Sequence, residues 1–115
     1  MSPTPALDWL FSLQRFGMRP GLERVRDLLA ATGLPAPGTR VVLVAGTNGK
    51  GSVARLVAAS LTRSGRRTGS FFSPHLERVG ERARVDGEES SAAAMEAAVA
   101  AVRPHAERLG CTFFE

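Results

Sequence analysis

One stretch, VVLVAGTNGKGSVARL from Val41 to Leu56, constrains the fold more than any other part of the chain. Its start, Val41 to Ala45, is a continuous apolar run bounded by turn residues, which is typical of a strand buried on both faces of a parallel sheet. A glycine-rich turn follows, and apolar residues then recur at helical spacing as far as Gly65. With the next apolar run, TGSFFS, the pattern predicts a βαβ unit.

Helices are predicted on both sides of this unit. PALDWLFSLQRFG and GLERVRDLLAATG carry apolar residues at helical spacing and end in glycine, so residues 1–38 form an N-terminal helical segment. SAAAMEAAVAAVRPHAERLG predicts a helix with Ser90 or Ser91 as N-cap, which Pro104 is expected to kink or split. RARVDG predicts a short strand and turn, and CTFFE one more strand.

The predicted fold class is therefore α/β, a P-loop-type parallel sheet with flanking helices. The last predicted strand, CTFFE, leaves a hydrophobic sheet edge uncovered, which favours a piece of a larger α/β domain.

Composition narrows the function classes. No stretch approaches the roughly 20 apolar residues of a membrane span, and the first residues do not form a signal peptide, so we expect a cytoplasmic protein without a membrane partner. The net charge of +4 is compatible with binding to nucleic acid. However, the arginines are scattered among acidic residues, and no aromatic side chains lie beside them to stack on bases, so no nucleic-acid partner is predicted. The single cysteine, Cys111, cannot form an internal disulfide, and its apolar neighbours indicate a buried small hydrophobe.

The only lysine, Lys50, lies in the glycine-rich turn. A strand that runs through GTNGKGS into a helix gathers backbone N–H groups at the helix N-terminus, where a phosphate is stabilised. A lysine there reaches the β- and γ-phosphates of a nucleotide, and a nearby serine hydroxyl reaches Mg²⁺. The standard motif has Gly where Val44 stands and Ser or Thr where Gly51 stands, so a tight turn without a ligand also remains open.

Three motifs, taken together, resemble one protein family. VAGTNGKGS, the later SPHLERVGERARVDG and the earlier FGMRPGLERVRDLL are similar, in order and spacing, to the folylpolyglutamate synthase/dihydrofolate synthase family of the Mur ligase superfamily. The resemblance runs from about Leu7 to Glu115. It implies that residues 1–115 are part of an ATP-binding, Mur-ligase-like domain, and it disfavours an ordinary P-loop kinase.

The resemblance implies an ATP-dependent ligase that adds L-glutamate to the carboxylate of a folate or dihydropteroate. ATP would phosphorylate that carboxylate, and the amine of glutamate would attack the acyl phosphate, with ATP and Mg²⁺ as cofactors and a monomeric full-length enzyme. The family's later segments have no counterpart in these residues. A stand-alone or remnant nucleotide-binding module without turnover is therefore the alternative.

The resemblance also implies site residues. The family's phosphate loop maps onto consecutive positions, with Lys50 as the catalytic cation: Gly46, Thr47, Asn48, Gly49, Lys50, Gly51 and Ser52. The implied Mg²⁺ ligands are Ser52, the serine of the SPH motif and the glutamate that ends the TFFE motif, which are Ser73 and Glu115 here. A turn-forming Ser-Pro and a solvated acid are the plain alternatives for these last two.

Two histidines and one loop stand apart from this assignment. His75 in the SPH motif fits a surface histidine as well as a ligand, and His105 matches no family position. Residues 78–82 read RVGER where the family has approximately R-F-N-E-R, which puts the contact of this loop with folate in doubt.

Overall fold

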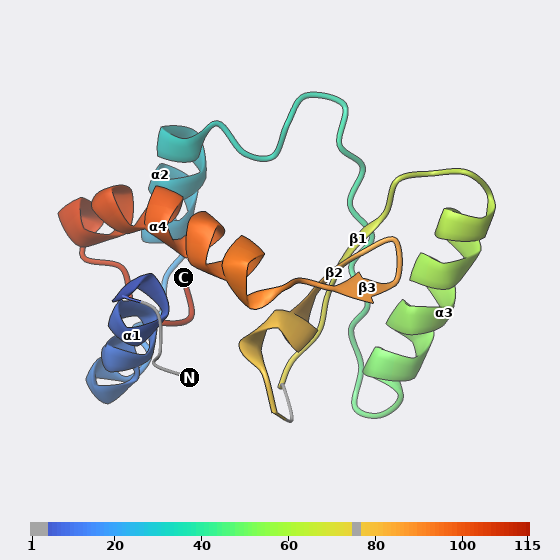
Figure 1. The fold of residues 1–115 in the computed structure, drawn as a ribbon, viewed down its shortest axis with the longest axis horizontal. Coiled ribbons are helices and arrows are strands. Elements are labelled where there is room, and N and C mark those ends of the chain that lie inside the picture. The colour runs from blue at the N-terminus through green and yellow to red at the C-terminus, as the bar shows by residue number, and fades with distance from the viewer. Residues whose placement is uncertain (1–4, 75–76) are drawn as a thin grey trace. The chain divides into compact units, whose positions relative to one another are not determined.

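The structure is a computed structural model that describes residues 5–74 and 77–115. The chain divides into two compact units, one formed by Met1–Arg40 with Glu96–Glu115 and the other by Val41–Met95. Figure 1 labels the helices and strands. Their bounds in chain order are α1 Pro5–Ser12, the 3-10 helix η1 Leu13–Phe16, α2 Glu23–Thr32, α3 Lys50–Arg63, β1 Gly69–Phe71, the 3-10 helix η2 Val79–Arg82, β2 Ala83–Val85, β3 Glu88–Glu89 and α4 Ala92–Leu109.

The first unit is helical, as the sequence predicts. The helix expected over PALDWLFSLQRFG is present as α1 continued by η1, and it ends at Gly17. α2 ends at Gly33, whose φ of 70° lies in the left-handed region that glycine adopts without strain. The core of this unit is small, with a few partly exposed side chains packed around three buried ones: Leu28, Ala106, Cys111, Trp9, Val102 and Leu109.

The single thiol belongs to this core. Cys111 is buried, and burial raises the pKa of its thiol above the ordinary value. A thiol with a raised pKa forms little thiolate, so the expectation of a small buried hydrophobe rather than a nucleophile is confirmed.

α4 begins at the predicted cap. The Ser91 hydroxyl accepts a hydrogen bond of 3.1 Å from the Ala94 N–H, so of the two candidate serines it is Ser91 that caps the helix. Of the two outcomes expected at Pro104, a kink or a split, the split does not occur, because α4 runs unbroken from Ala92 to Leu109. Proline removes one backbone donor, and the alanine-rich sequence around it favours the helix strongly enough to continue.

The sheet lies in the second unit and is antiparallel. Its strand order is β1-β2-β3, with Gly69 opposite Val85 and Arg84 opposite Glu89. The strand predicted over TGSFFS is present as β1, and RARVDG forms β2 and the turn into β3. That turn has two residues, Asp86 and Gly87, with φ of 52° and 85°, as a tight hairpin requires.

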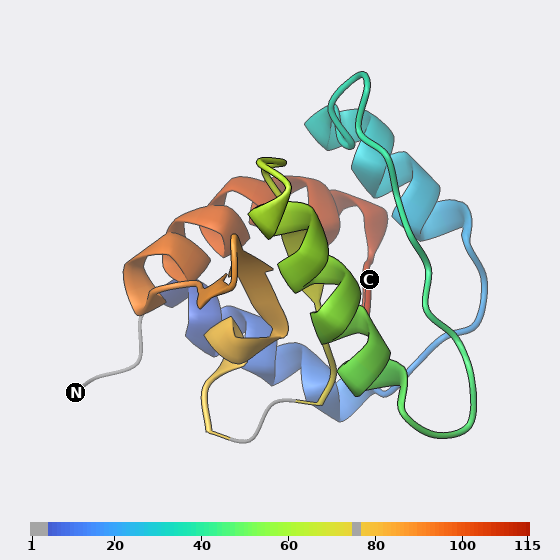
Figure 2. The ribbon, with the colours of Figure 1, turned by 90° about the vertical axis from the view of Figure 1, so that its right-hand side faces the viewer.

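The predicted parallel sheet is wrong for the described residues. Val41–Ala45 adopts no regular structure, and 111–115, expected as a strand, contains a turn. Figure 2 shows the stretch before α3 as coil that passes beside this helix. A strand exists only as part of a hydrogen-bonded ladder, and a buried parallel strand needs a neighbour at each edge. In the described chain the only ladder partners are β1, β2 and β3, which pair with one another.

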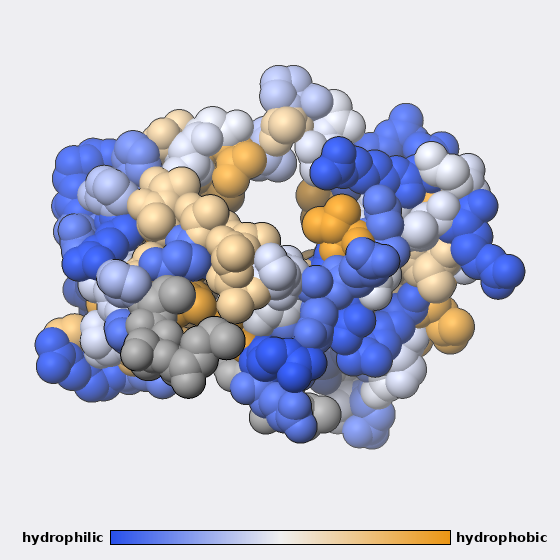
Figure 3. Space-filling model, in the orientation of Figure 1, coloured by the Kyte–Doolittle hydropathy of each residue, from blue (hydrophilic) through white to orange (hydrophobic). Residues whose placement is uncertain are grey.

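The second unit leaves large apolar side chains in contact with solvent. In its extended stretch Val41, Val42 and Leu43 are 78%, 63% and 88% exposed. Val53 and Leu56 of α3 are exposed as well. In the space-filling view, orange apolar side chains interrupt the polar surface (Figure 3). The apolar side chains that predicted a buried strand are therefore present, but no other described residue shields them from solvent.

Membrane insertion through a helix is not supported by the structure. Over residues 5–74 and 77–115, no helix combines the length and the apolar character that crossing a bilayer requires.

Candidate functional site: a phosphate-binding loop before α3

The glycine-rich turn forms a loop that leads directly into α3. Gly46 has a φ of 152°, and Gly49 adopts a left-handed conformation with φ 76° and ψ 7° at the N-cap of the helix. Residues with a side chain rarely adopt these backbone angles, which explains why the sequence has glycine at both positions. The Val53 N–H donates to the Gly49 carbonyl at 3.0 Å, so the helical hydrogen bonding begins at the end of the loop.

The N-terminus of α3 has no side-chain cap. Gly49 offers no side chain to accept from the first helical N–H groups, and no acidic residue lies in the first turn. The N–H groups of Lys50, Gly51 and Ser52 therefore lack helical partners, as in every first turn, and they carry the positive end of the helix dipole. These are the donors that an anion such as a phosphate binds.

Lys50 adds its charge to this loop. Its ammonium donates to the Gly46 carbonyl at 2.7 Å and to the Thr47 carbonyl at 3.4 Å, so the side chain folds back over the loop instead of extending into solvent. Since Lys50 is also the first residue of α3, backbone donors and ammonium belong to one short segment. The structure thus brings the predicted phosphate-loop residues together.

Gly51 and Ser52 occupy the open side of the first turn. No heavy atom lies within 4 Å of the point where a Cβ of Gly51 would stand. The Ser52 side chain is exposed. Packing within the protein therefore does not require glycine at position 51, and the space beside Gly51 is free for a ligand.

Ser73 follows the sheet in the same unit. The Phe72 N–H donates to the Arg82 carbonyl at 2.8 Å and extends the pairing of β1 by one residue, and Ser73 comes next. The guanidinium of Arg55 on α3 lies 5.3 Å from the centre of the Phe72 ring, which ties this strand end to the helix of the phosphate loop. Ser73 is exposed and precedes a cis peptide bond to Pro74. His75 lies outside the described residues.

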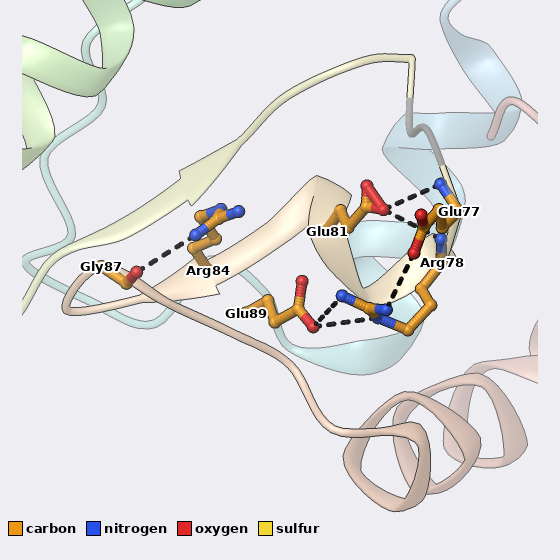
Figure 4. A network of polar contacts seen from close by, with 6 residues as sticks. All are labelled: Glu77, Arg78, Glu81, Arg84, Gly87 and Glu89. Atoms are coloured by element: carbon orange, nitrogen blue, oxygen red, sulfur yellow. Dashed lines mark hydrogen bonds and ion pairs between the residues drawn. The ribbon is translucent and has the colours of Figure 1, made fainter.

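The loop that departs from the family pattern is built from local contacts. Figure 4 shows the Arg78 guanidinium bound to Glu89 at 2.9 Å and to Glu77 at 3.3 Å, while Glu81 accepts from the N–H groups of Glu77 and Arg78. A Cβ on Gly80 would stand 2.2 Å from the Ser90 carbonyl oxygen. Position 80 thus has no room for the amide side chain that the resemblance implies.

Glu115 belongs to the first unit and is held on both carboxylate oxygens. The Arg24 guanidinium donates to Oε1 at 2.7 Å, and Oε2 accepts from the Thr112 N–H at 2.7 Å and the Thr112 hydroxyl at 3.1 Å. Burial alone would raise the pKa of Glu115, but the hydrogen bonds from Thr112 and Arg24 outweigh it and lower the pKa below the ordinary value. The side chain is only 6% exposed, so the plain alternative of a merely solvated acid does not hold.

Mg²⁺ takes oxygen ligands in a near-octahedral shell, and the candidate residues differ in how well they fit it. The exposed hydroxyls of Ser52 and Ser73 suit such an ion in chemistry. Glu115 does not fit in this arrangement, because protein donors hold both of its oxygens. Among the residues that the structure describes, no three His, Cys, Asp or Glu side chains gather as metal ligands.

Sequence reasoning missed the long-range contacts of the first unit. Arg24 reaches Glu115 across 91 positions, and Glu96 reaches the N-terminus of α1 across 90. No local sequence pattern predicts either contact, because arginines and glutamates on the surfaces of helices are usually solvated. A comparison of many related sequences is the signal that could have found them.

The chain was compared with known proteins, and no family model matches it. A probable bifunctional folylpolyglutamate synthase/dihydropteroate synthase of Haloferax volcanii is 45% identical over 115 residues, which cover 96% of this chain and 14% of that protein. The dihydrofolate synthase/folylpolyglutamate synthase of Bacillus subtilis is 37% identical over 107 residues, covering 93% of this chain and 25% of that protein.

Solved structures agree with these relatives. E. coli FolC in complex with DHPP and ADP matches with a TM-score of 0.85 and 36% identity, over 96% of this chain and 28% of that one. A folylpolyglutamate synthase complex with AMPPCP and folate matches with a TM-score of 0.84 and 36% identity, over 99% of this chain and 30% of that one.

The fold and the comparisons thus define an α/β chain of the kind found in folate-related synthases. More specifically, over nearly its whole length the chain is similar to a part of the folylpolyglutamate synthase/dihydrofolate synthase proteins. It spans 14% to 30% of the length of the relatives just described.

Proposed function

We propose that this chain supplies the phosphate-binding part of an ATP-dependent ligase that adds L-glutamate to a folate or dihydropteroate. One observation carries the proposal: the uncapped N-terminus of α3 is joined directly to a loop over which the Lys50 ammonium folds. The complexes of the related enzymes with ADP and AMPPCP support a nucleotide as the anion. Residues 1–115 would then be part of the ATP-binding domain, with 1–38 as its N-terminal helical segment.

The residues of the loop would act by binding and orienting the triphosphate. The N–H groups of Lys50, Gly51 and Ser52 would donate to phosphate oxygens, and Gly46 and Gly49 let the backbone come close to them. The Lys50 ammonium would leave the Gly46 carbonyl and stabilise the charge that moves onto the β- and γ-phosphates as the bond between them breaks. When bound with the nucleotide, Mg²⁺ supplies further positive charge, and Ser52 and Ser73 would offer it oxygen ligands.

The reaction follows from the chemistry of the substrates. A carboxylate is a poor electrophile, so transfer of the γ-phosphoryl group gives it a leaving group. Attack by the amine of glutamate on the acyl phosphate then releases phosphate and forms the amide, with ADP as the other product. The protein contributes mainly by holding anionic reactants in the right geometry and by offsetting their charge.

Three further points belong to the same proposal. The full-length enzyme would be a cytoplasmic monomer that binds no nucleic acid. The ion pairs of Arg24, Arg78 and Arg103 with glutamates support the last of these, because paired arginines add little to a phosphate-binding surface.

Calorimetry with Mg·ATP tests the proposal. Lys50→Ala should reduce the affinity of the chain for Mg·ATP at least tenfold, while Arg63→Ala, which removes an equal charge at the other end of α3, should change it little. Equal affinities for the unmodified chain and Lys50→Ala, or equal losses in both variants, would rule out a phosphate site at this loop.

A further inference from the structure

α3, which follows the phosphate loop, packs on the sheet of its own unit through a face of mostly short side chains. Its partly buried residues recur at helical spacing and contact β1: Ala54, Val57, Ala58, Leu61 and Thr62. The hydroxyls of Ser60 and Thr62 donate to carbonyls of α3 itself, at 2.8 and 2.9 Å, so they do not tie the helix to the strand. Short side chains interlock little with a neighbour, so this face alone fixes the helix weakly along the strand.

Arg55 adds a directed contact beside this face. Its guanidinium lies 5.3 Å from the centre of the Phe72 ring, within the range of a cation–π interaction. The Phe72 side chain is partly buried, and its N–H donates to the Arg82 carbonyl at 2.8 Å. Pairing with the next strand therefore sets the backbone of Phe72, and Arg55 sets the position of α3 relative to it.

This contact joins the two segments that the proposed site needs. Arg55 lies in the second turn of α3, on the helix that begins with Lys50, and Phe72 directly precedes Ser73. A helix is rigid over two turns, so the place of Arg55 follows that of the phosphate loop. A shift of α3 along the sheet would therefore change the separation between this loop and Ser73.

We propose that Arg55 is a positioning residue that, through the Phe72 ring, holds the strand end before Ser73 at a fixed place relative to the phosphate loop. The inference rests on the proposed function, in which the loop binds the phosphates and Ser73 faces the accompanying Mg²⁺. Arg55 itself touches neither the nucleotide nor the metal ion. Its effect should appear only when both segments must act on one ligand.

Paired calorimetric titrations with ATP, in Mg²⁺ and in EDTA, test the proposal. The quantity to compare is the gain in ATP affinity that Mg²⁺ provides. Arg55→Gln should reduce this gain about two- to fivefold, the size expected for one exposed cation–π contact. Loss of charge alone acts in the opposite direction, because metal-free ATP is more negative than Mg·ATP and would be weakened more.

Three further variants separate positioning from charge. Phe72→Leu keeps the arginine and should reduce the gain as much as Arg55→Gln, and the double variant should lose no more than either single one. Arg55→Lys keeps a cation over the ring and should retain most of the gain. Circular dichroism checks folding, and should Phe72→Leu unfold, the comparison of Gln with Lys at the exposed position 55 decides.

Several results would overturn the proposal. They are an unchanged or larger gain in Arg55→Gln, an equal loss in Arg55→Lys, and losses that add in the double variant. Lys50→Ala should weaken ATP binding both in Mg²⁺ and in EDTA, as the proposed function requires. Lys50-dependent binding with an unchanged gain in Arg55→Gln would therefore reject the positioning role alone.

Hydrogen exchange reads the contact without any nucleotide. The Phe72 N–H should exchange faster in Arg55→Gln than in the unmodified chain and in Arg55→Lys, because the strand end has lost its attachment to α3. Equal exchange rates in the three proteins would reject the positioning role whatever the titrations show. ATP binding that does not depend on Lys50, or no binding in any variant, would reject the proposed function and this inference with it.

Discussion

The carboxylate of Glu96 accepts a hydrogen bond of 2.8 Å from the backbone N–H of Ala6, and its other oxygen accepts one of 3.0 Å from the N–H of Leu7. The Glu96 side chain of α4 therefore accepts hydrogen bonds from the first N–H groups of α1, as an N-cap residue normally does for its own helix. An isolated helix as short as α1 is marginal in water, so this contact across the sequence helps to fix it in the first unit.

Removal of this contact should destabilise the first unit. We expect Glu96→Ala to lower the free energy of unfolding by about 1–2 kcal/mol, because two helix N–H groups lose a charged acceptor. Urea denaturation followed by circular dichroism measures the change. The control is Glu107→Ala on the same helix, whose exposed ion pair with Arg103 should contribute less than about 0.5 kcal/mol. Equal effects of the two variants would contradict the capping role.

The two glycines around Lys50 should respond in opposite ways to alanine. Gly49 has a φ of 76°, so Gly49→Ala forces a side chain into the left-handed region and should cost about 1–2 kcal/mol. Gly51 is helical with open space at its Cβ position, so Gly51→Ala should stabilise α3 by about 0.5–1 kcal/mol. Thermal unfolding of both variants checks this, and a stabilised Gly49→Ala would show that the loop geometry is wrong.

Glu115 should make the stability of the chain depend on pH. Its pKa is lowered in the folded state, so its contribution is fully present above the unfolded value of 4.5 and is lost as the pH falls through the lower folded value. We therefore expect the difference in unfolding free energy between the unmodified chain and Glu115→Gln to shrink between pH 6 and pH 3. Denaturation series at several pH values measure it, and a difference that stays constant with pH would refute the prediction.

The exposed stretch before the phosphate loop should promote self-association. Leu43 is 88% exposed between other apolar residues whose backbone belongs to no sheet, a combination that favours pairing with another chain. Leu43→Lys should lower the fraction of associated protein seen by analytical ultracentrifugation at a given concentration. Ala59→Lys, at an exposed position of α3, is the matched control for the added charge. An equal reduction in both variants would mean that net charge, and not this stretch, is responsible.

Local patterns in the sequence predicted local structure well. The glycine-rich turn before α3, the end of α2 at Gly33 and the hairpin turn at Asp86 and Gly87 each depend on backbone angles that a few neighbouring residues determine. The conformation of the glycine-rich loop was predictable for the same reason, since its glycines and its lysine lie within one short segment.

Structure that depends on distant partners was not predictable in this way. The apolar run at Val41 has the composition of a buried strand, but composition does not supply the neighbouring strands that a ladder needs. Glu115 could be assigned only through a resemblance, and nothing near it in sequence indicated that Arg24 would hold it. In both cases the missing information lies in pairing between residues far apart along the chain.

The first unit is built from both ends of the chain, with the whole of Val41–Met95 between its two parts. During synthesis, every residue of the second unit is therefore added to the chain before Glu96, Ala106 and Cys111. While the second unit is being synthesised, α1 and α2 therefore lack α4, the helix that completes their core. The order of synthesis thus leaves the N-terminal helices dependent on residues that are translated only after the whole second unit.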